Sequence, residues 1–408
     1  MCKVLVSRQA ILNVPNLRFP EFSGEWKKIR VSDLLEFFST NSLSWDQLEY
    51  GGTDIFNLHY GLIHSGLSTQ ISLKKSILPS VKSEYRPRNY TLCEDGDVAF
   101  ADASEDTNEV GKVVEFVDCA GKEIVCGLHT IHGRDKLGKT VVGFKGYAFS
   151  SPAFHNQIRR IAQGTKIFSI NTGNFEEIFI GVPQKEEQDK ISHLLSLLDQ
   201  RIAIQNRAIE QYESLIKGIV DITILGKEKN ANIGDICSIS KQIKVEANLN
   251  DIISVRLHGK GVCKSCAENL QIGSTQYYRR RTGQLIYGKQ NFHNGAIGIV
   301  PESLDNGITS KDIPSFDIDR LKCNSLYLLA QLQSPQYYRQ AEALTTGTGS
   351  KRLKEETFLK MPIVLPDKEE QDNIASLVSC VMTKLDLARR LLALFSCQKN
   401  YLLDQLFV

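Results

Sequence analysis

Two long stretches of the sequence repeat apolar residues at alternating intervals of three and four positions. Spacing of this kind, sustained over several heptads, indicates an amphipathic helix with a coiled-coil seam. Each stretch follows a proline and opens with acidic residues, which the positive end of a helix dipole favours. We therefore predict one helix over 184–226 and another over 367–408, each about 60 Å long at 1.5 Å per residue. The seam residues are Ile191, Leu195, Leu198, Ile202, Ile209 and Tyr212 in the first stretch, and Ile374, Val378, Val381, Leu385, Leu392 and Phe395 in the second.

The two stretches belong to a larger internal repeat. VPQKEEQDKI at 182–191 returns as LPDKEEQDNI at 365–374, 183 residues later, and Ser151-Pro152 returns as Ser334-Pro335 at the same offset. Further upstream, VSDL at 31–34 resembles IGDI at 233–236, and GDVAF at 96–100 resembles GQLIY at 283–287. A repeat of this length predicts two domains of one fold. We expect an α+β fold with domains at 1–183 and 227–366, separated and joined by two long antiparallel coiled-coil helices.

The second copy departs from the first at two helix positions. Lys399 stands where the first copy has Ile216, and Met382 stands where it has Asp199. We therefore expect helix surfaces of unequal strength for binding a partner. The carboxylates of KEEQD are interpreted as favouring the helix start and not as a catalytic pair, and the chain is predicted to have no catalytic residue.

Composition narrows the classes of partner. The chain of 408 residues has a net charge of only +2, so any binding of a polyanion has to come from local clusters. It has no apolar run of membrane-spanning length and no signal peptide, and its ten cysteines without a secretion signal favour reduced thiols in the cytoplasm. The pair Cys263 and Cys266 matches no zinc-binding pattern, so no metal site is predicted.

Basic clusters occur once in each half. Asp135 is the one acidic residue between Ile124 and Phe175, and no acidic residue lies between Asn269 and Pro301. Cations among aromatic and amide side chains suit a nucleic-acid surface, because they neutralise phosphates and can bond to base edges. The predicted DNA-binding residues are Arg134, Lys136, Lys139, Lys145, Arg159, Arg160 and Lys166 in the first half, and Tyr277, Tyr278, Arg279, Arg280, Arg281, Lys289, Lys351 and Arg352 in the second.

One short motif supports a different function. GRDKLGKT at 133–140 fits the pattern of a nucleotide-binding P-loop, which would make the chain an NTPase. The β-branched residues and glycine of 140–143 disfavour the helix that has to follow such a loop. A second alternative is a protein-binding rod built on the long helices, without DNA.

The duplicated domains suggest a protein that recognises two DNA half-sites. Several motifs also resemble one known family. NLRFPEFSGEW at 16–26, GLHT at 127–130, YYRRRTGQLIYGKQNFHNGAIGIVP at 277–301 and the doubled KEEQD helices are similar to the specificity subunit of Type I restriction-modification systems. The resemblance implies a non-catalytic subunit whose two target recognition domains read an asymmetric, interrupted DNA sequence.

The resemblance also implies partners for the chain. Its helices would act as a spacer and bind two methyltransferase subunits, which would carry S-adenosylmethionine and methylate adenine. Restriction subunits would use ATP and Mg²⁺ in the full complex. The chain itself is expected to bind no cofactor.

Overall fold

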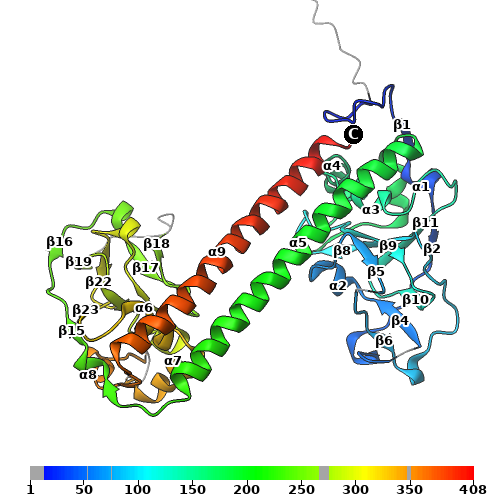
Figure 1. The fold of residues 1–408 in the computed structure, drawn as a ribbon. Helices are drawn as coiled ribbons and strands as arrows, with labels where there is room; N and C mark the ends of the chain where they lie inside the picture. The colour runs from blue at the N-terminus through cyan, green and yellow to red at the C-terminus, as the bar shows by residue number, and fades with distance from the viewer. Residues whose placement is uncertain (1–12, 53, 75, 266–274, 347–350) are drawn as a thin grey trace, which may run out of the picture. The chain divides into compact units, whose positions relative to one another are not determined.

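A computed structural model describes residues 13–52, 54–74, 76–265, 275–346 and 351–408. The chain forms two compact units (Figure 1). The first unit contains the residues up to Gln205 together with Leu391–Val408, and the second contains Asn206–Arg390. Each unit therefore includes part of both long helices, which are α5 (Lys185–Val220) and α9 (Lys368–Gln405).

The first unit is built on two sheets. The larger has the spatial order β2 (Leu35–Phe38), β11 (Thr130–Asp135), β7 (Val98–Ala101), β9 (Val113–Asp118) and β5 (Gln70–Ser72). Its pairs are antiparallel except β5 with β9, which is parallel. The smaller sheet has the order β10 (Glu123–Cys126), β4 (Ile55–Leu58), β6 (Ser80–Val81) and β3 (Leu48–Glu49).

Short helices complete the first unit, and its main core lies where they meet the larger sheet and the long helices. They are α1 (Val31–Leu34), α2 (Tyr60–His64), α3 (Phe144–Phe149) and α4 (Pro152–Ile161). Ser151 is the N-cap of α4 and accepts a hydrogen bond from the amide of Phe154, with proline in the first turn as its sequence predicts. Phe100, Phe149 and Leu195 are fully buried in this core.

The second unit repeats the central sheet of the first. Its order is β15 (Cys237–Ile239), β23 (Ser315–Ile318), β20 (Leu285–Tyr287) and β21 (Ile297–Ile299), all antiparallel. Position by position this is the order β2, β11, β7 and β9 of the first unit. GDVAF leads into β7 and GQLIY into β20, so the loose resemblance between these sequences reflects equivalent strands. The prediction of two domains that share structure is confirmed.

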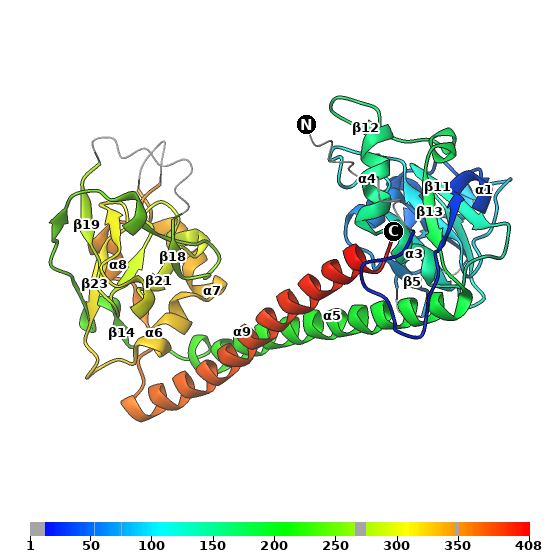
Figure 2. The same cartoon turned by 90° about the horizontal axis from the view of Figure 1, so that it is seen from above.

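Smaller elements surround this second sheet. The strands are β16 (Lys244–Val245), β19 (Tyr277–Arg279) and β22 (Ile308–Ser310) in one sheet, and β17 (Ile253–Val255) and β18 (Val262–Lys264) in another. Figure 2 shows α6 (Ser325–Leu332) and α7 (Pro335–Tyr338) beside the strands of this unit, and α8 (Glu355–Leu359) completes it. Mixed helix and strand content in both units agrees with the predicted α+β class.

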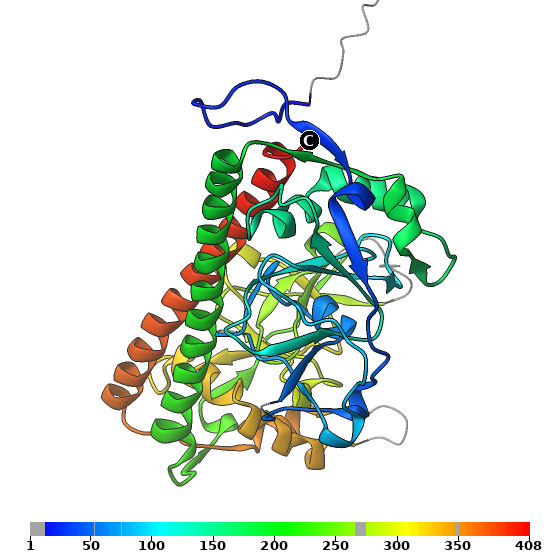
Figure 3. The ribbon, with the colours of Figure 1, turned by 90° about the vertical axis from the view of Figure 1, so that its right-hand side faces the viewer.

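Each long helix is reached through a short antiparallel strand pair. In the first unit β13 (Phe179–Val182) pairs with β1 (Lys27–Arg30), and in the second β24 (Pro362–Ile363) pairs with β14 (Ala231–Asn232). The first helix ends in a π-helical turn, Asp221–Leu225. In the first unit the start of α5 and the end of α9 lie side by side (Figures 1 and 3). None of the described helices is both long and apolar enough to cross a membrane.

Candidate nucleic-acid interface

The P-loop match at 133–140 does not have the structure of a nucleotide-binding loop. Gly133 and Arg134 lie inside β11, and the next helix, α3, begins only at Phe144. Asp135 accepts hydrogen bonds from the amides of Leu137 and Thr140, at 2.8 Å each. A P-loop directs its amides at phosphate, whereas these amides are bound to a carboxylate of the loop itself. The geometry contradicts the NTPase alternative.

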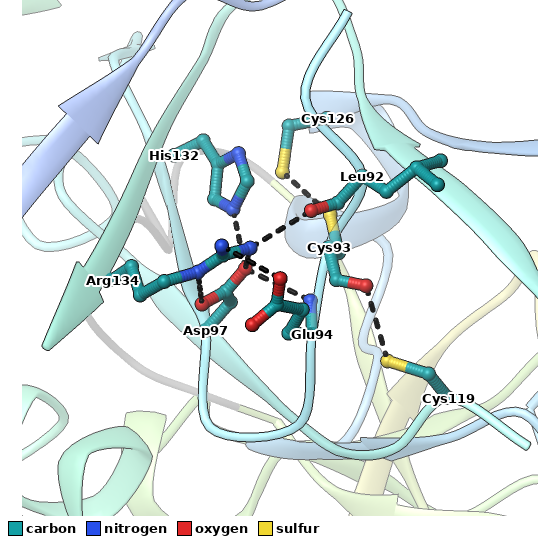
Figure 4. A network of polar contacts seen from close by, with 8 residues as sticks. All are labelled: Leu92, Cys93, Glu94, Asp97, Cys119, Cys126, His132 and Arg134. Atoms are coloured by element: carbon teal, nitrogen blue, oxygen red, sulfur yellow. Dashed lines mark hydrogen bonds and ion pairs between the residues drawn. The ribbon is translucent and has the colours of Figure 1, made fainter. Parts of the chain in front are cut away.

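Arg134, the first of the predicted DNA-binding cations, is partly buried and bound to carboxylates of its own domain. Its Nε and Nη2 donate to the two carboxylate oxygens of Asp97, each at 2.8 Å, and its Nη1 donates to Glu94 (Figure 4). Burial alone would raise the pKa of Asp97, but hydrogen bonds from Arg134 and His132 outweigh it and hold that pKa below its usual value. Arg134, near the end of β11, therefore stabilises the buried carboxylate of Asp97.

Lys145 is buried, which corrects its prediction as a DNA contact. Its side chain is 2% exposed, and Nζ lies 3.3 Å from Glu115 Oε1 and 2.8 Å from Thr140 Oγ1. The amides of Gly143 and Gly146 donate to the same Glu115 carboxylate. Burial raises the pKa of Glu115. Because an unpaired carboxylate is costly in the interior, Lys145 stabilises the fold here and cannot reach a phosphate.

The remaining predicted cations of the first unit lie at its surface. Lys136 and Lys139 are exposed in the loop before α3, and Lys136 Nζ donates to the carbonyl of Ser32. Arg159 and Arg160 are exposed in the last turn of α4, and Lys166 is exposed beyond it. These side chains lie on two separate segments, one before α3 and one at and beyond the end of α4.

One basic strand near α4 was missed by the sequence argument. Lys28 and Arg30 of β1 stand over the ring of Phe179 in the paired strand β13, at 4.8 and 5.7 Å from the ring centroid. Lys28 and Arg160 line the same surface hollow. The signal was the run KKIR at 27–30, which lies outside the acid-poor segment used for the prediction.

In the second unit the tyrosine and arginine run divides between inside and outside. Tyr277 is 7% exposed and Arg280 is fully buried, whereas Tyr278 and Arg279 are half-buried and Arg281 is exposed. Arg279 lines a polar hollow at the edge of β19.

The burial of Arg280 corrects its prediction as a DNA contact. The guanidinium donates to Thr309 Oγ1 at 2.7 Å, to Ser315 Oγ at 2.9 Å and to the carbonyl of Ile313 at 2.8 Å. A fourth bond runs to Gln242 Oε1. Burial lowers the pKa of Arg280 to about 10, and the group remains charged at neutral pH. Arg280 therefore joins three segments of the sheet edge.

The other predicted cations of the second unit are paired with carboxylates. Lys289 Nζ lies 2.7 Å from Glu355 Oε1, and its side chain is 12% exposed. The exposed cations Lys351 and Arg352 pair with Glu342 and Asp312 respectively. Their charges are already balanced within the unit, which makes them weaker candidates for phosphate contact than Arg279 and Arg281.

The repeated glutamine of KEEQD makes the same contacts in both units. Gln188 Oε1 accepts from the amide of Val141 at 2.9 Å, and its Nε2 donates to the carbonyls of Lys139 and Pro183. In the second unit Gln371 bonds to Asn324, Lys322 and Pro366. All four positions are related by the 183-residue offset. The glutamine fixes the loop before the next helix to the first turn of the long helix.

Glu187, the residue before Gln188, has a structural role that the sequence did not reveal. Glu187 is 1% exposed and accepts from Arg18 Nε and Nη2, both at 2.8 Å, and from Trp26 Nε1 at 3.3 Å. The interpretation of the KEEQD carboxylates as favouring the helix start is incomplete for Glu187, which is buried and paired. The NLRFPEFSGEW and KEEQD motifs are joined here, since Arg18 and Trp26 belong to the first and Glu187 to the second.

The predicted seam residues are most deeply buried near the helix starts. Ile191, Leu195 and Leu198 belong to the core of the first unit, together with Leu402 near the end of α9 and Leu406 just after it. In the second unit Ile374 and Val378 pack with Val220. Val381 and Leu385 are buried, and the half-buried members of the predicted set are Ile202, Ile209, Tyr212, Leu392 and Phe395.

Comparison with known proteins identifies the family. The model of the Type I restriction modification DNA specificity domain matches residues 23–214 and again 227–394. The chain belongs to this family. Each half is thus a DNA specificity domain of a Type I restriction-modification specificity subunit, in agreement with the resemblance carried by the motifs.

Solved structures support the same fold. The S subunit of a Type I restriction-modification system from M. genitalium aligns with a TM-score of 0.62 over 97% of this chain and 99% of that chain, at 14% identity. A chain from a structure describing complex assembly and conformational transition of a Type I system aligns at 0.51, over 93% and 96%, at 13% identity. No curated protein sequence matches the chain significantly.

Proposed function

We propose that this chain is a non-catalytic DNA-recognition subunit and that each unit reads one half of a bipartite, asymmetric DNA site. The observation that carries the proposal is the double match to the DNA specificity domain, once in each half of the chain. The two units share strand order but differ in their surface residues, so the two half-sites should differ in sequence. Base-specific contacts would come from the domains, and phosphate contacts would fix their register.

Some of the cations predicted from the sequence have structural roles inside the units. The others, which lie at the surface, are the proposed phosphate contacts. They are exposed or half-buried, and none of them forms a salt bridge with a carboxylate among the described residues. The set comprises Lys136, Lys139, Arg159, Arg160 and Lys166 in the first unit and Arg279 and Arg281 in the second, with Tyr278 beside them.

The long helices are proposed to form an antiparallel coiled coil that sets the gap between half-sites. Two pairs of charged residues, one in each unit, support this: Asp199 with Lys399, and Glu213 with Arg389. We further propose that the outer faces of the helices bind two methyltransferase subunits, in a cytoplasmic complex that also includes restriction subunits. S-adenosylmethionine, ATP and Mg²⁺ would be carried by those partners.

DNA titration of the complex reconstituted with its methyltransferase tests the proposal. Specific binding should weaken steeply with salt, because each neutralised phosphate releases counterions. Binding that is indifferent to salt, or absent from the assembled complex, would contradict DNA recognition and favour a protein-binding rod.

A further inference from the structure

Three potential metal-binding side chains meet inside the first unit. Cys93, Cys126 and His132 each place a ligand atom within 4.8 Å of the others, and all three are buried. The two sulfurs are 3.5 Å apart (Figure 4). Two sulfurs bound to one tetrahedral zinc at about 2.3 Å each lie about 3.8 Å apart. The pair is therefore spaced much as a shared zinc ion requires.

The histidine is oriented for binding through Nδ1. Its Nε2 lies 2.8 Å from Asp97 Oδ2, and that carboxylate also accepts from Arg134 and from the amide of Glu94. Nε2 therefore keeps its hydrogen, and Nδ1 is the atom left for a ligand. His132 is 1% exposed, and its Nδ1 has no hydrogen-bond partner. Figure 4 shows this nitrogen on the side of the ring that faces Cys126. A carboxylate behind the second nitrogen is the usual support of a metal-binding histidine.

The second unit has a buried cation at the equivalent place. Cys93 and Arg280 occupy equivalent positions in the two units. Cys93 lies five residues before Val98, the first residue of β7, and Arg280 lies five residues before Leu285, the first residue of the equivalent strand β20.

The other two positions of the cluster correspond as well. His132 pairs with Ala99 of β7, and Ser315 pairs with Ile286 at the same place in β20. His132 and Ser315 are therefore equivalent. Val125 pairs with Leu92 in the first unit, and Ile308 pairs with Arg279 in the second. Cys126 and Thr309 each follow by one residue, so they also occupy equivalent positions.

The side chains at these positions differ in a way that points to a metal. In the second unit the Arg280 guanidinium donates to Thr309 Oγ1 and Ser315 Oγ. In the first unit the same positions carry two thiols, which are soft ligands, and an imidazole, which also suits zinc. Two thiolates would balance the charge of a divalent ion, so the bound site would be neutral in a buried environment.

We infer that Cys93, Cys126 and His132 bind a thiophilic divalent cation, Zn²⁺, through the two sulfurs and His132 Nδ1. The fourth tetrahedral position is left to a water molecule. The ion would join the end of β10, in the smaller sheet, to β11, in the larger one. Its role is structural: it holds the two sheets of the first unit together, as Arg280 does for the corresponding strands of the second. Binding would displace the protons of both thiols.

The sequence predicted no metal site because these three residues fit no short pattern. Cys93 and Cys126 are 33 residues apart, and the histidine follows six residues later. The pair considered instead was Cys263 with Cys266, and Cys266 lies outside the described residues.

Metal analysis of the full chain, purified under reducing conditions, tests the site. We expect one zinc ion per chain, and after its removal Co²⁺ should give thiolate-to-cobalt charge-transfer bands and the visible bands of a tetrahedral site. Cys126→Ser and His132→Ala should each abolish or shift these bands. Cys119→Ser is the matched control, because Cys119 is a buried thiol that bonds to the Cys93 carbonyl but is outside the cluster. This variant should keep the cobalt spectrum of the wild type.

Two further measurements decide the case even where a variant fails to fold. Wild-type chain should release its zinc in step with titration of thiols by a mercurial reagent, and its melting temperature should fall on chelation and recover with Zn²⁺. Substoichiometric zinc together with no cobalt charge-transfer band would overturn the inference. So would a disulfide between Cys93 and Cys126 in the reduced preparation, or an unchanged cobalt spectrum in Cys126→Ser.

Discussion

Lys399 Nζ lies 2.6 Å from Asp199 Oδ1, which ties the end of α9 to the first half of α5 inside the first unit. Both side chains are 17% exposed, and Tyr147 Oη donates to the other oxygen of the same carboxylate at 2.8 Å. The positions that correspond to this pair in the second unit carry Ile216 and Met382. The two positions at which the helix copies differ are therefore partners. They form an ion pair in the first unit and carry two apolar residues in the second.

A double-mutant cycle should detect this pair. Lys399→Ala and Asp199→Ala are expected to couple by about 1–2 kcal/mol in the free energy of unfolding, because the charges are mostly removed from water. Arg389 and Glu213 provide the control, since they pair at 2.6 Å but are half exposed. Denaturant unfolding should give this second pair a clearly smaller coupling; equal couplings would mean that burial of Lys399 and Asp199 adds nothing.

The repeated glutamines should matter equally in both units. Gln188→Ala and Gln371→Ala each remove three hydrogen bonds made by a buried side chain, and each is expected to cost about 1–3 kcal/mol in stability. Gln184→Ala is a suitable control because that side chain is exposed. Thermal unfolding of the three variants measures the effect. Variants of Gln188 and Gln371 as stable as the control would show that these bonds do not hold the loops.

Neighbouring arginines of the second unit should respond differently to truncation. Arg281→Ala should weaken DNA binding by the assembled complex and lower its salt slope by about 1, as expected for one lost phosphate contact. Lys351→Ala should change the slope less, because that ammonium already pairs with Glu342. Arg280→Ala should instead lower the melting temperature. A normal melting temperature with a reduced salt slope for Arg280→Ala would contradict its assignment to the interior.

Sequence reasoning found the repeat, the two long helices and the family, because these depend on patterns that recur along the chain. It could not separate Arg280 from Arg281, since both are arginines of one basic run and only the fold buries the first and exposes the second. Lys145 was misassigned because its partner Glu115 is 30 residues away and lies outside the acid-poor segment. Glu187 was misread because its partners Arg18 and Trp26 come from the opposite end of the domain.

Lengthening the spacer should alter the gap in the DNA site. Inserting four residues, about one helical turn, after Gln205 in α5 should change the number of unspecified base pairs and leave both half-sites intact. Methylation mapping with the insertion variant measures this directly. New half-sites with the original gap would contradict the role of the helices as a spacer, and insertion of four residues in an exposed surface loop serves as the control.

The most direct test of the account is a genome-wide map of adenine methylation in cells that co-express this chain with its methyltransferase subunit. The account predicts one interrupted motif whose two halves differ in sequence, and loss of all methylation when the chain is omitted. A methylated site without a gap, a palindromic motif, or methylation that persists without the chain would contradict it.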